Sequence, residues 1–442
     1  DPTSGPVPMD LQQLVLEDLR VSASYSKCWR ARESTLTSVV GSDEESYCYL
    51  AEYLRLLKLT NPGTITHIET ERDVEDDSKE RFLYMFLAFG ASIAGFKHLR
   101  RILAVDGTHL KGKYKGVLLT ASGQDANFQV YPLGFAVVDN ENDESWTWFF
   151  MKLERIIADI KTLTILSDRH SSILVAVKRV FPQANHRACI IHLCRNVQAL
   201  TQLVKNAGYA FTGTKFKELY GKIESTNQNC GKYLHDIGMA NWTRHYFRGQ
   251  RFNLMTSNIA ETLNKVLNKG RSSHIVELIR FIRSMLTRWF NARRKKSLEH
   301  KGPVPPEVDK QITKTVLTTN GSKVGRITNL SYEINCMLGG RNVVDLEKKQ
   351  CTCKRYDKLK IPCSHALVAA NSFTISYKAL VDDCFKPHAW VSSYRETVFP
   401  EAIGRDEKIP EELEHRSMLP PYTRRPSGRP KVASIPSTGE YK

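Results

Sequence analysis

Three cysteines and one histidine stand in two close pairs, Cys351/Cys353 and Cys363/His365, within the segment CTCKRYDKLKIPCSH. Thiolate sulfur and imidazole nitrogen are donors that Zn²⁺ prefers, and four of them complete the tetrahedral shell of a structural site. One residue between the members of each pair lets both side chains of a strand or turn point to the same side. We therefore predict a structural Zn²⁺ site without an open coordination position. The alternative is two chance clusters of reduced cysteines.

Two aspartates follow short apolar runs, Asp106 after ILAV and Asp168 after ILS. If the two runs are parallel neighbouring strands, both carboxylates reach the sheet edge at which open α/β sheets bind their ligands. A predicted helix at 256–269 would add Glu261 on its polar face. Three carboxylates in one place are typical of a site for two Mg²⁺ (or Mn²⁺) ions that act on a phosphodiester.

Each of these carboxylates also has a simpler interpretation. Asp106 and the following glycine could form a turn, and Asp168 could cap a helix that begins near Ser171. Glu261 follows an asparagine by three residues, a spacing that suits a capping box. The three residues together, on predicted elements that bring them to one edge of a basic protein, favour a metal site over three separate local roles.

The elements that must position these residues follow a recognisable order. Residues 101–195 are predicted to form three strands, a helix, a strand, a helix and a strand, which gives an α/β fold with a mixed sheet flanked by helices. The predicted segments are a mostly helical lead-in (1–100), the first part of the core (101–195), a helical insertion (196–255), the last core helices with a basic segment (256–300), a small zinc-binding hairpin and helix module (325–375) and a basic, Pro-rich disordered tail (400–442). Polar residues around 300–330 suggest a linker.

Composition indicates a polyanionic partner. The formal net charge is +17, and the basic residues gather in clusters after residue 100, for example at 270–296, which we expect to contact nucleic acid. The four basic residues at 293–296 suggest nuclear import. No apolar run reaches the ~18–20 residues of a membrane span, and the N-terminus lacks a signal-peptide pattern. Because the chain does not begin with Met, we expect it to be a fragment or a processed product.

Several motifs together resemble a known family. The segments AVDGTHL, ILSDRH, CIIH and MTSNIAETLN, followed by CTC and CSH, resemble the Mutator-like element (MULE) transposases of plants over residues 80–400. The resemblance implies an RNase H-like core with a DDE triad, a helical insertion before the glutamate, and a SWIM zinc finger. It assigns Asp106, Asp168 and Glu261 to the catalytic, Mg²⁺-binding triad, and Cys189 and His192 to an auxiliary pair near it. Without the resemblance, Cys189 is equally a buried core thiol.

The resemblance also implies a function. It predicts a cut-and-paste DNA transposase that hydrolyses phosphodiesters at element ends and joins the freed 3′-OH to target DNA. Its partners would be terminal-repeat DNA, target DNA and further copies of the chain, in the nucleus and away from membranes. Two alternatives remain at this point: a domesticated, non-catalytic DNA-binding transcriptional regulator, and an RNase H-like nuclease that acts on RNA.

Two smaller features complete the sequence-based expectations. The GRP core at 428–430, between basic residues, is similar to a minor-groove AT-hook. Trp146 and Trp148 stand at the start of a predicted helix, where we expect them to be core residues rather than platforms for base stacking.

Overall fold

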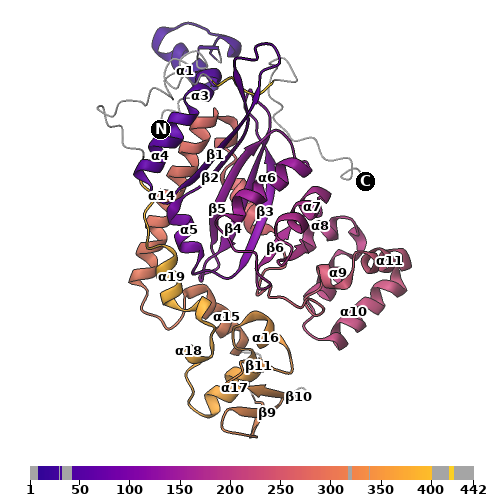
Figure 1. Ribbon diagram of the computed structural model, residues 1–442. Helices are drawn as coiled ribbons and strands as arrows, with labels where there is room; N and C mark the ends of the chain where they lie inside the picture. The colour runs from indigo at the N-terminus through magenta and orange to yellow at the C-terminus, as the bar shows by residue number, and fades with distance from the viewer. Residues whose placement is uncertain are drawn as a thin grey trace.

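A computed structural model describes residues 8–28, 30–31, 42–316, 321–337, 339–400 and 418–422. Its centre is a seven-stranded sheet with the order β1-β2-β5-β4-β3-β6-β7, and a four-stranded sheet, β11-β10-β9-β8, which follows later in the sequence, stands apart from it (Figure 1). The predicted α/β fold, a mixed sheet flanked by helices with a small separate module, is confirmed. The central strands are β1 (Ile65–Arg72), β2 (Glu80–Ala88), β3 (Ile102–His109), β4 (Val117–Gln124), β5 (Val130–Val138), β6 (Thr164–Ser167) and β7 (Asn185–Ala188).

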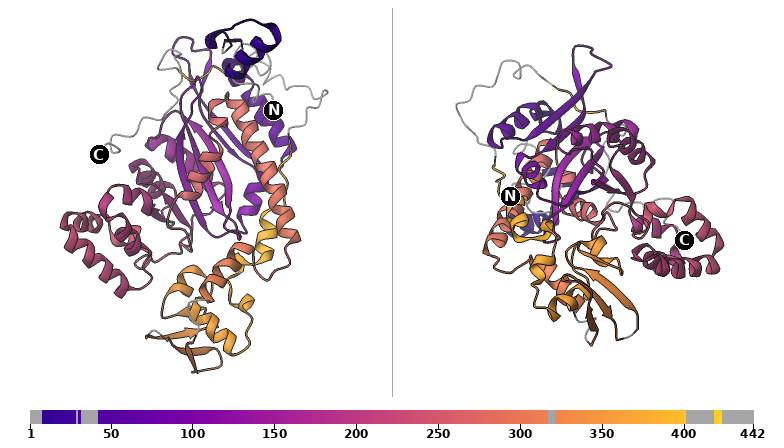
Figure 2. Two further views of the ribbon diagram at one scale, coloured as in Figure 1. Left: turned by 180° about the vertical axis from the view of Figure 1, so that it is seen from behind. Right: turned by 60° about the horizontal axis from the view of Figure 1, so that its bottom comes forward.

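Helices cover both faces of this sheet. Side chains such as Tyr53, Ile282 and Phe290 form the core on one face. The long helix α14 covers this face, as the left view of Figure 2 shows. Trp146 and Val177 belong to the core of the other face, under α6 and α7. The helices around the sheet are α1 (Pro8–Leu19), α3 (Asp43–Cys48), α4 (Leu50–Thr60), α5 (Gly90–Phe96), α6 (Asp143–Glu154), α7 (Ser171–Val180), α8 (Ile190–Arg195), α13 (Asn258–Val266) and α14 (Ile275–Glu299).

The strand pairing brings the two predicted aspartates to the same end of the sheet. Strands β1 to β5 pair antiparallel, whereas β3, β6 and β7 pair parallel. Ala104 of β3 lies opposite Leu166 of β6 in the parallel pair. Asp106 in β3 and Asp168, just after β6, each lie two residues beyond this pair, at the same end of the sheet. β3 begins with a fully buried run, as expected of a strand that is covered on both faces.

The predicted lead-in at 1–100 belongs in part to the central sheet. β1 and β2 pair with each other, and β2 also pairs with β5, at Phe86 opposite Ala136. The hairpin therefore extends the sheet beyond the segment at 101–195. This pairing joins residues 50 positions apart, and no local pattern in the sequence reveals it.

An all-helical lobe follows α8, as expected from the sequence. It consists of α9 (Thr201–Tyr209), α10 (Gly213–Thr226), α11 (Gln228–Asp236) and α12 (Met239–Trp242), and it projects to one side of the sheet (Figure 1). Its own core includes Phe216, Leu234 and Trp242. We call residues 196–255, which contain α9 to α12, the helical insertion.

The C-terminal part contains more structure than expected. Residues 306–316 form helix α15 (Pro306–Val316) where a linker was expected, and Val308 and Ile312 are buried. The zinc-binding module follows, with a core that includes Tyr332, Val344 and Tyr356. Its elements are β8 (Lys323–Arg326), β9 (Ser331–Asn335), β10 (Arg341–Asp345), β11 (Gln350–Cys351), α16 (Arg355–Leu359), α17 (Ser364–Ser372) and α18 (Tyr377–Leu380).

After this module the chain returns to the central sheet. Helix α19 (Pro387–Ser393) is followed by Tyr394, whose hydroxyl donates to buried Asp125 Oδ2 over 2.9 Å. Arg293 and Arg294 of the predicted import signal also hydrogen-bond to Tyr394, so half of that basic tetrapeptide supports the fold.

A short part of the predicted disordered tail is ordered. Leu419 exchanges backbone hydrogen bonds with Glu80 and Phe82 at the start of β2. Tyr422 donates to Asp73 Oδ1 over 2.7 Å. The prediction is therefore wrong for residues 418–422, and the AT-hook-like sequence at 428–430 lies outside the described residues.

The two tryptophans of α6 differ in environment. Trp146 is fully buried, which confirms its predicted core role. Trp148 is half-buried, stacks obliquely on Tyr84 and donates from Nε1 to Glu69 Oε2 over 3.1 Å.

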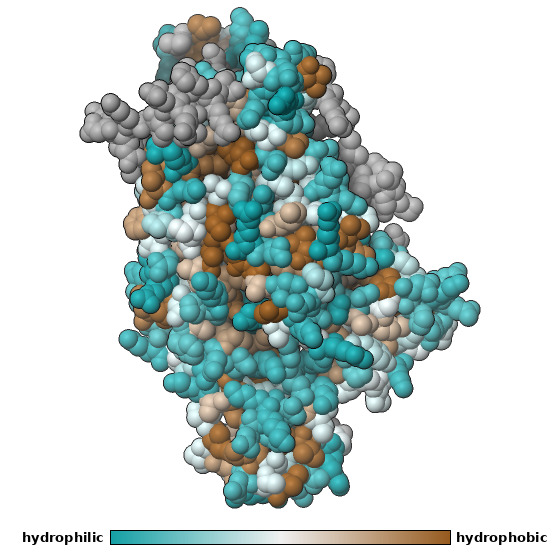
Figure 3. All heavy atoms as spheres, in the orientation of Figure 1, coloured by the Kyte–Doolittle hydropathy of each residue, from teal (hydrophilic) through white to brown (hydrophobic). Residues whose placement is uncertain are grey.

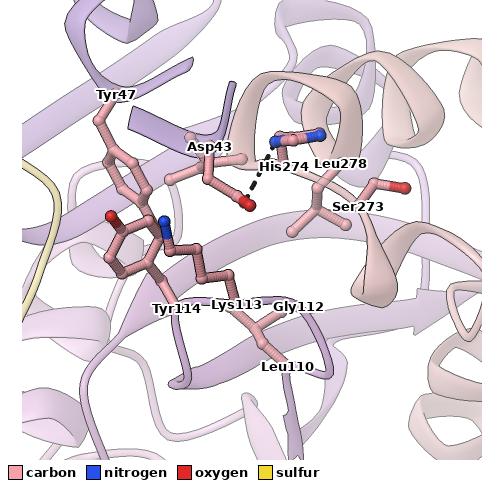
Figure 4. A pocket seen from close by; sticks show the side chains of 10 residues that line it. Asp43, Tyr47, Leu110, Gly112, Lys113, Tyr114, Ser273, His274 and Leu278 are labelled. Carbon is pink, nitrogen blue, oxygen red and sulfur yellow. Dashed lines mark ion pairs between the residues drawn. The ribbon is translucent and has the colours of Figure 1, made fainter. Parts of the chain in front are cut away.

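The surface is mostly polar. Hydrophilic side chains cover the region between the helical insertion and the zinc-binding module (Figure 3). A small pocket between α3, the β3–β4 loop and the start of α14 is lined by Tyr114 and Lys113, and Asp43 pairs there with His274 at 3.1 Å (Figure 4). Among the described residues, no helix is both long and apolar enough to cross a membrane.

Candidate active site and zinc centre

Asp106 lies within β3, not in a turn. The strand continues to His109, so the turn interpretation of the Asp-Gly pair is wrong. Asn264 of α13 donates from Nδ2 to Asp106 Oδ2 over 2.8 Å, and the same Asn264 accepts from Thr120 of β4. The carboxylate is therefore oriented from a helix that is far away in the sequence.

Asp168 immediately follows β6. Its Oδ1 accepts the backbone N–H of His170 over 3.1 Å. His170 itself is the N-cap residue of α7, and no side chain makes a cap hydrogen bond there, so the N-cap interpretation of Asp168 is also wrong. The parallel β3–β6 pairing leaves Asp168 at the same sheet end as Asp106.

Glu261 lies on α13, which packs against β3, β4 and β5 through Ile259, Ala260 and Leu263. The helix begins after Ser257, so Glu261 is its fourth residue and not the third residue that a capping box requires. Glu261 Oε1 is buried and has no hydrogen-bond partner. Its ion-pair partner is His192, with Nε2 at 3.6 Å.

Electrostatics link these carboxylates. Burial, together with the negative charge of Asp168, raises the pKa of Asp106 to about 7. Glu141 and Glu261 contribute to this rise, whereas the positive charge of His192 opposes it. The chain therefore gathers four acidic groups and one imidazole at one end of the sheet.

Glu141 is the member of this group that sequence reasoning missed. Burial raises the pKa of its carboxyl group, and the charge of Asp168 contributes. Its carboxylate lies against Gly107, where an added Cβ would come within 2.6 Å of it. The residue precedes Asn142, the N-cap of α6. In the sequence it is one of several acidic residues around that helix start, and such residues are expected there for the helix dipole alone.

The oxygen atoms of these acidic groups are suitable ligands for Mg²⁺ but do not form a tight cage. Mg²⁺ prefers carboxylate oxygens and keeps several waters, so it needs only a few protein ligands. Glu261 Oε1, which has no hydrogen-bond partner, and the negative charge gathered around Asp106 fit such an ion. In the described part of the chain, however, only the cysteine–histidine cluster brings three or more ligand atoms within 4.8 Å of one another.

Cys189 and His192 connect this edge to α13. Cys189 follows β7, and its Sγ accepts the N–H of Ser257 over 3.3 Å. Burial alone would raise the pKa of the thiol, but hydrogen bonding to His192 and Ser257 outweighs it and lowers the value. Hydrogen bonding to Cys189 raises the pKa of His192. Since His192 also faces Glu261, this pair forms part of the surroundings of the carboxylates.

The four predicted zinc ligands do converge. Their ligand atoms all lie within 4.8 Å of one another, with His365 Nδ1 at 3.5 Å from Cys351 Sγ and at 3.9 Å from Cys363 Sγ. Hydrogen bonds with Cys351 and Cys363 lower the pKa of Cys353. The hydrogen bond with Cys353 raises the pKa of Cys351, and hydrogen bonds with both other thiols raise that of Cys363. A tetrahedral Zn²⁺ would hold all three sulfurs as thiolates. The cluster supports a structural zinc.

Two family comparisons agree with these two sites. Residues 102–196 match the MULE transposase domain, a span that runs from β3 to α8 and contains Asp106 and Asp168. Residues 332–373 match the SWIM zinc finger, and this span contains all four zinc ligands. Glu261 lies outside both spans.

Individual relatives match over part of the chain. The chain is 25% identical to Protein FAR1-RELATED SEQUENCE 5 of Arabidopsis thaliana over 34% of its own length and 18% of the relative. It is 23% identical to Protein FAR1-RELATED SEQUENCE 6 of the same plant, over 44% of its own length and 27% of the relative. It is 29% identical to the transposase of insertion sequence element IS905 of Lactococcus lactis, over 27% and 30%, respectively.

The matched stretch spans less than a third of each of these relatives. Together with the two domain matches, the fold and the converging zinc ligands, they confirm the resemblance seen in the motifs. Residues 102–196 therefore match the MULE transposase domain, and a match to the SWIM zinc finger follows at residues 332–373.

Proposed function

We propose that this protein is a DNA transposase that hydrolyses phosphodiester bonds at element ends and transfers the freed strand into target DNA. The observation that carries the proposal is the gathering of acidic groups at the end of β3 and β6. Three negative charges and burial keep the pKa of Asp106 near neutrality in the absence of a cation. Groups held in this way form a cation-binding site that is suited to phosphoryl transfer.

Asp106, Asp168 and Glu261 would hold Mg²⁺, or Mn²⁺, which would supply positive charge for the attacking and leaving oxygens of the phosphodiester. The protein residues have separate tasks. Asn264 orients the Asp106 carboxylate by its hydrogen bond. His192 and Cys189 hold Glu261 and α13 near the sheet edge. Positioning and charge neutralisation supply most of the catalysis in such sites.

The experiment that tests this proposal replaces Asp106 with asparagine. Asp106→Asn keeps the side-chain volume and removes the charge, so strand cleavage and strand transfer should fall by about 10³-fold or more. Binding of terminal-repeat DNA should persist. Asp236→Asn, the same change on the exposed surface of α11, serves as the control and should retain activity. Full cleavage by Asp106→Asn in Mg²⁺ or Mn²⁺ would refute the triad.

A second candidate function is a domesticated transposase that regulates transcription by binding DNA without cleaving it. Two observations favour it: the carboxylate oxygens do not converge into a cage, and several matched relatives carry names that do not describe transposases. The same assay separates the two functions, because the regulator would bind DNA and show no cleavage even as wild type.

The proposed activity implies partners and a location. The partners would be terminal-repeat and target DNA, with a homo-oligomer pairing two element ends. The place of action would be the nucleus. Lys295 and Lys296 of the basic tetrapeptide are exposed, whereas Arg293 and Arg294 are engaged in the fold, so nuclear import through this segment would rest on the two lysines.

A further inference from the structure

Five cationic side chains meet where the helical insertion approaches the zinc finger. Arg187 comes from β7, beside the carboxylate edge, and Arg244 and Arg251 come from the segment between α12 and α13. Arg355 and Lys358 come from α16, which lies between the two pairs of zinc ligands. We call these five residues the cationic cluster. It draws on three parts of the chain that are separated in sequence.

The contacts show that the insertion and the finger meet here. Lys358 Nζ donates to the carbonyl of Phe247 over 2.6 Å. Arg355 and Arg244 both lie over the ring of Phe211, at 5.2 and 4.5 Å from its centroid. Arg187 and Arg251 both lie over the ring of Phe247, at 4.3 and 5.1 Å. Two aromatic rings therefore hold four guanidinium groups.

The cluster lacks counter-charge. Among the described residues, none of the five cations forms an ion pair with a carboxylate, although Arg244 and Arg251 are only 5% and 2% exposed. Burial, together with the charges of Arg187 and Arg244, lowers the pKa of Arg251 to about 9. The Nε atoms of Arg187, Arg244 and Arg251 are buried without a hydrogen-bond partner.

Such an arrangement is costly for a protein with no ligand. Arginine is almost never fully buried unless it is paired, because a buried charge without a partner loses its hydration. Stacking on aromatic rings recovers only part of that loss. A phosphate group would supply both the missing negative charge and acceptors for the planar guanidinium groups.

We propose that the cationic cluster binds the sugar–phosphate backbone of DNA, with the helical insertion and the zinc finger supplying opposite sides of the site. This inference deepens the proposed function and rests on it for the identity of the polyanion. Arg187 stands two residues before Cys189, so DNA held at the cluster lies next to the sheet end that carries Asp168. The zinc ion would then act on DNA binding indirectly, by fixing α16.

The test measures DNA binding separately from cleavage. Arg244→Gln and Arg251→Met are made in the Asp106→Asn background, together with Lys217→Gln, an exposed residue of α10, as the control. Binding of a short labelled DNA duplex is titrated at several salt concentrations in Mg²⁺-free buffer. We expect each cluster variant to raise Kd about tenfold. We also expect it to lower the salt-dependence slope by about 1 relative to the control.

A stability measurement distinguishes a binding site from a structural network. Arg251→Met keeps much of the packing and removes an unpaired buried charge. Without DNA, its Tm should therefore equal or exceed that of the parent. A clear loss of Tm would identify Arg251 as a structural residue and overturn the proposal. The proposal would also be overturned if both cluster variants bound DNA as the control does, or lost affinity for duplex RNA alone.

These outcomes are independent of the proposed catalysis. If the wild type cleaves element ends but the cluster variants bind DNA like Lys217→Gln, the phosphate site is wrong and the transposase function stands. If the wild type never cleaves but the cluster variants lose DNA affinity, the phosphate site stands and the catalytic function is wrong.

Discussion

The zinc centre and the carboxylate edge, for which we propose Mg²⁺, are assembled in different ways. The four zinc ligands come from one stretch of 15 residues, and their atoms lie within 4.8 Å of one another. The carboxylates come from two strands, a loop and a helix that span more than 150 positions, and their oxygens do not converge as tightly. The first site is organised by a local loop, the second by the whole sheet.

The difference shows what each site can do. A closed set of sulfur and nitrogen ligands leaves no position for a substrate, so its ion stabilises a module. Carboxylates spread along a sheet edge, with the pKa values of Asp106 and Glu141 raised, are typical of sites that take a cation together with a substrate. Variants at the two sites can separate the structural role of the zinc centre from the proposed catalytic role of the carboxylate edge, or show that this distinction is wrong.

The largest expected effect comes from removing a zinc ligand. Cys363→Ser should unfold the zinc-binding module and abolish stoichiometric zinc, because binding of a structural zinc contributes about 10 kcal/mol or more to the folding of such modules. Cys336→Ser, a change in the same module outside the cluster, is the control. Zinc content and limited proteolysis measure the outcome. The core should remain folded, and loss of Mg²⁺ binding there would contradict the separation of the two sites.

The next effect concerns catalysis without loss of folding. Glu261→Gln should lower strand cleavage by about 10²–10³-fold, since it removes one charge from the site. Its Tm should change little, because the buried Oε1 has no hydrogen bond to lose and gives up only the 3.6 Å ion pair with His192. Glu299→Gln at the end of α14 is the matched control. Unchanged cleavage by Glu261→Gln would remove Glu261 from the triad.

The pH dependence of stability should also reveal the carboxylate edge. The pKa of Asp106 rises from 3.8 to about 7 on folding, so folding binds a proton between these values. The stabilising proton is fully present below pH 3.8, and its contribution is lost as pH rises toward 7. Without Mg²⁺, wild type should therefore lose stability relative to Asp106→Asn by up to about 1.4 kcal/mol per pH unit, levelling off above pH 7. Urea unfolding at pH 5, 6, 7 and 8 measures this difference, and parallel curves would refute the shift.

The smallest effect tests the position of Glu141. Gly107→Ala places a Cβ within 2.6 Å of the Glu141 carboxylate, which must then move away from β3. Because that carboxylate is the end of a flexible side chain, we expect a two- to tenfold change in cleavage rate, about 1.4 kcal/mol or less, and little change in Tm. Gly221→Ala on α10, where an added Cβ meets nothing within 4 Å, is the control. Equal rates for the two variants would place Glu141 outside the working site.

Local patterns were sufficient for the elements that carry the site. The apolar runs before Asp106 and Asp168 and the amphipathic spacing around Glu261 predicted β3, β6 and α13, because burial on a sheet or a helix face leaves a regular period. The four zinc ligands were also predictable from the sequence, since all of them lie in one short segment.

Long-range pairing was the part that the sequence concealed. The addition of β1 and β2 to the sheet, the return of Leu419 to β2 and the approach of Glu141 to Gly107 depend on contacts between distant residues. In the sequence, nothing distinguishes Arg187, Arg244 and Arg251 of the cationic cluster from other basic residues. The spacing of residues along the chain predicts neither their burial nor their stacking on Phe211 and Phe247. Identifying such sites requires the packed structure.

The return of the chain to the sheet after the zinc finger has an evolutionary consequence. Because α14 precedes the finger and α19 follows it, and Tyr394 and Phe290 pack together on the sheet, the finger is a loop-like insertion into the core. A module joined at two neighbouring points can be exchanged for another without interrupting the core. Lineages of this protein could therefore change the surface that the finger presents while keeping the central sheet intact.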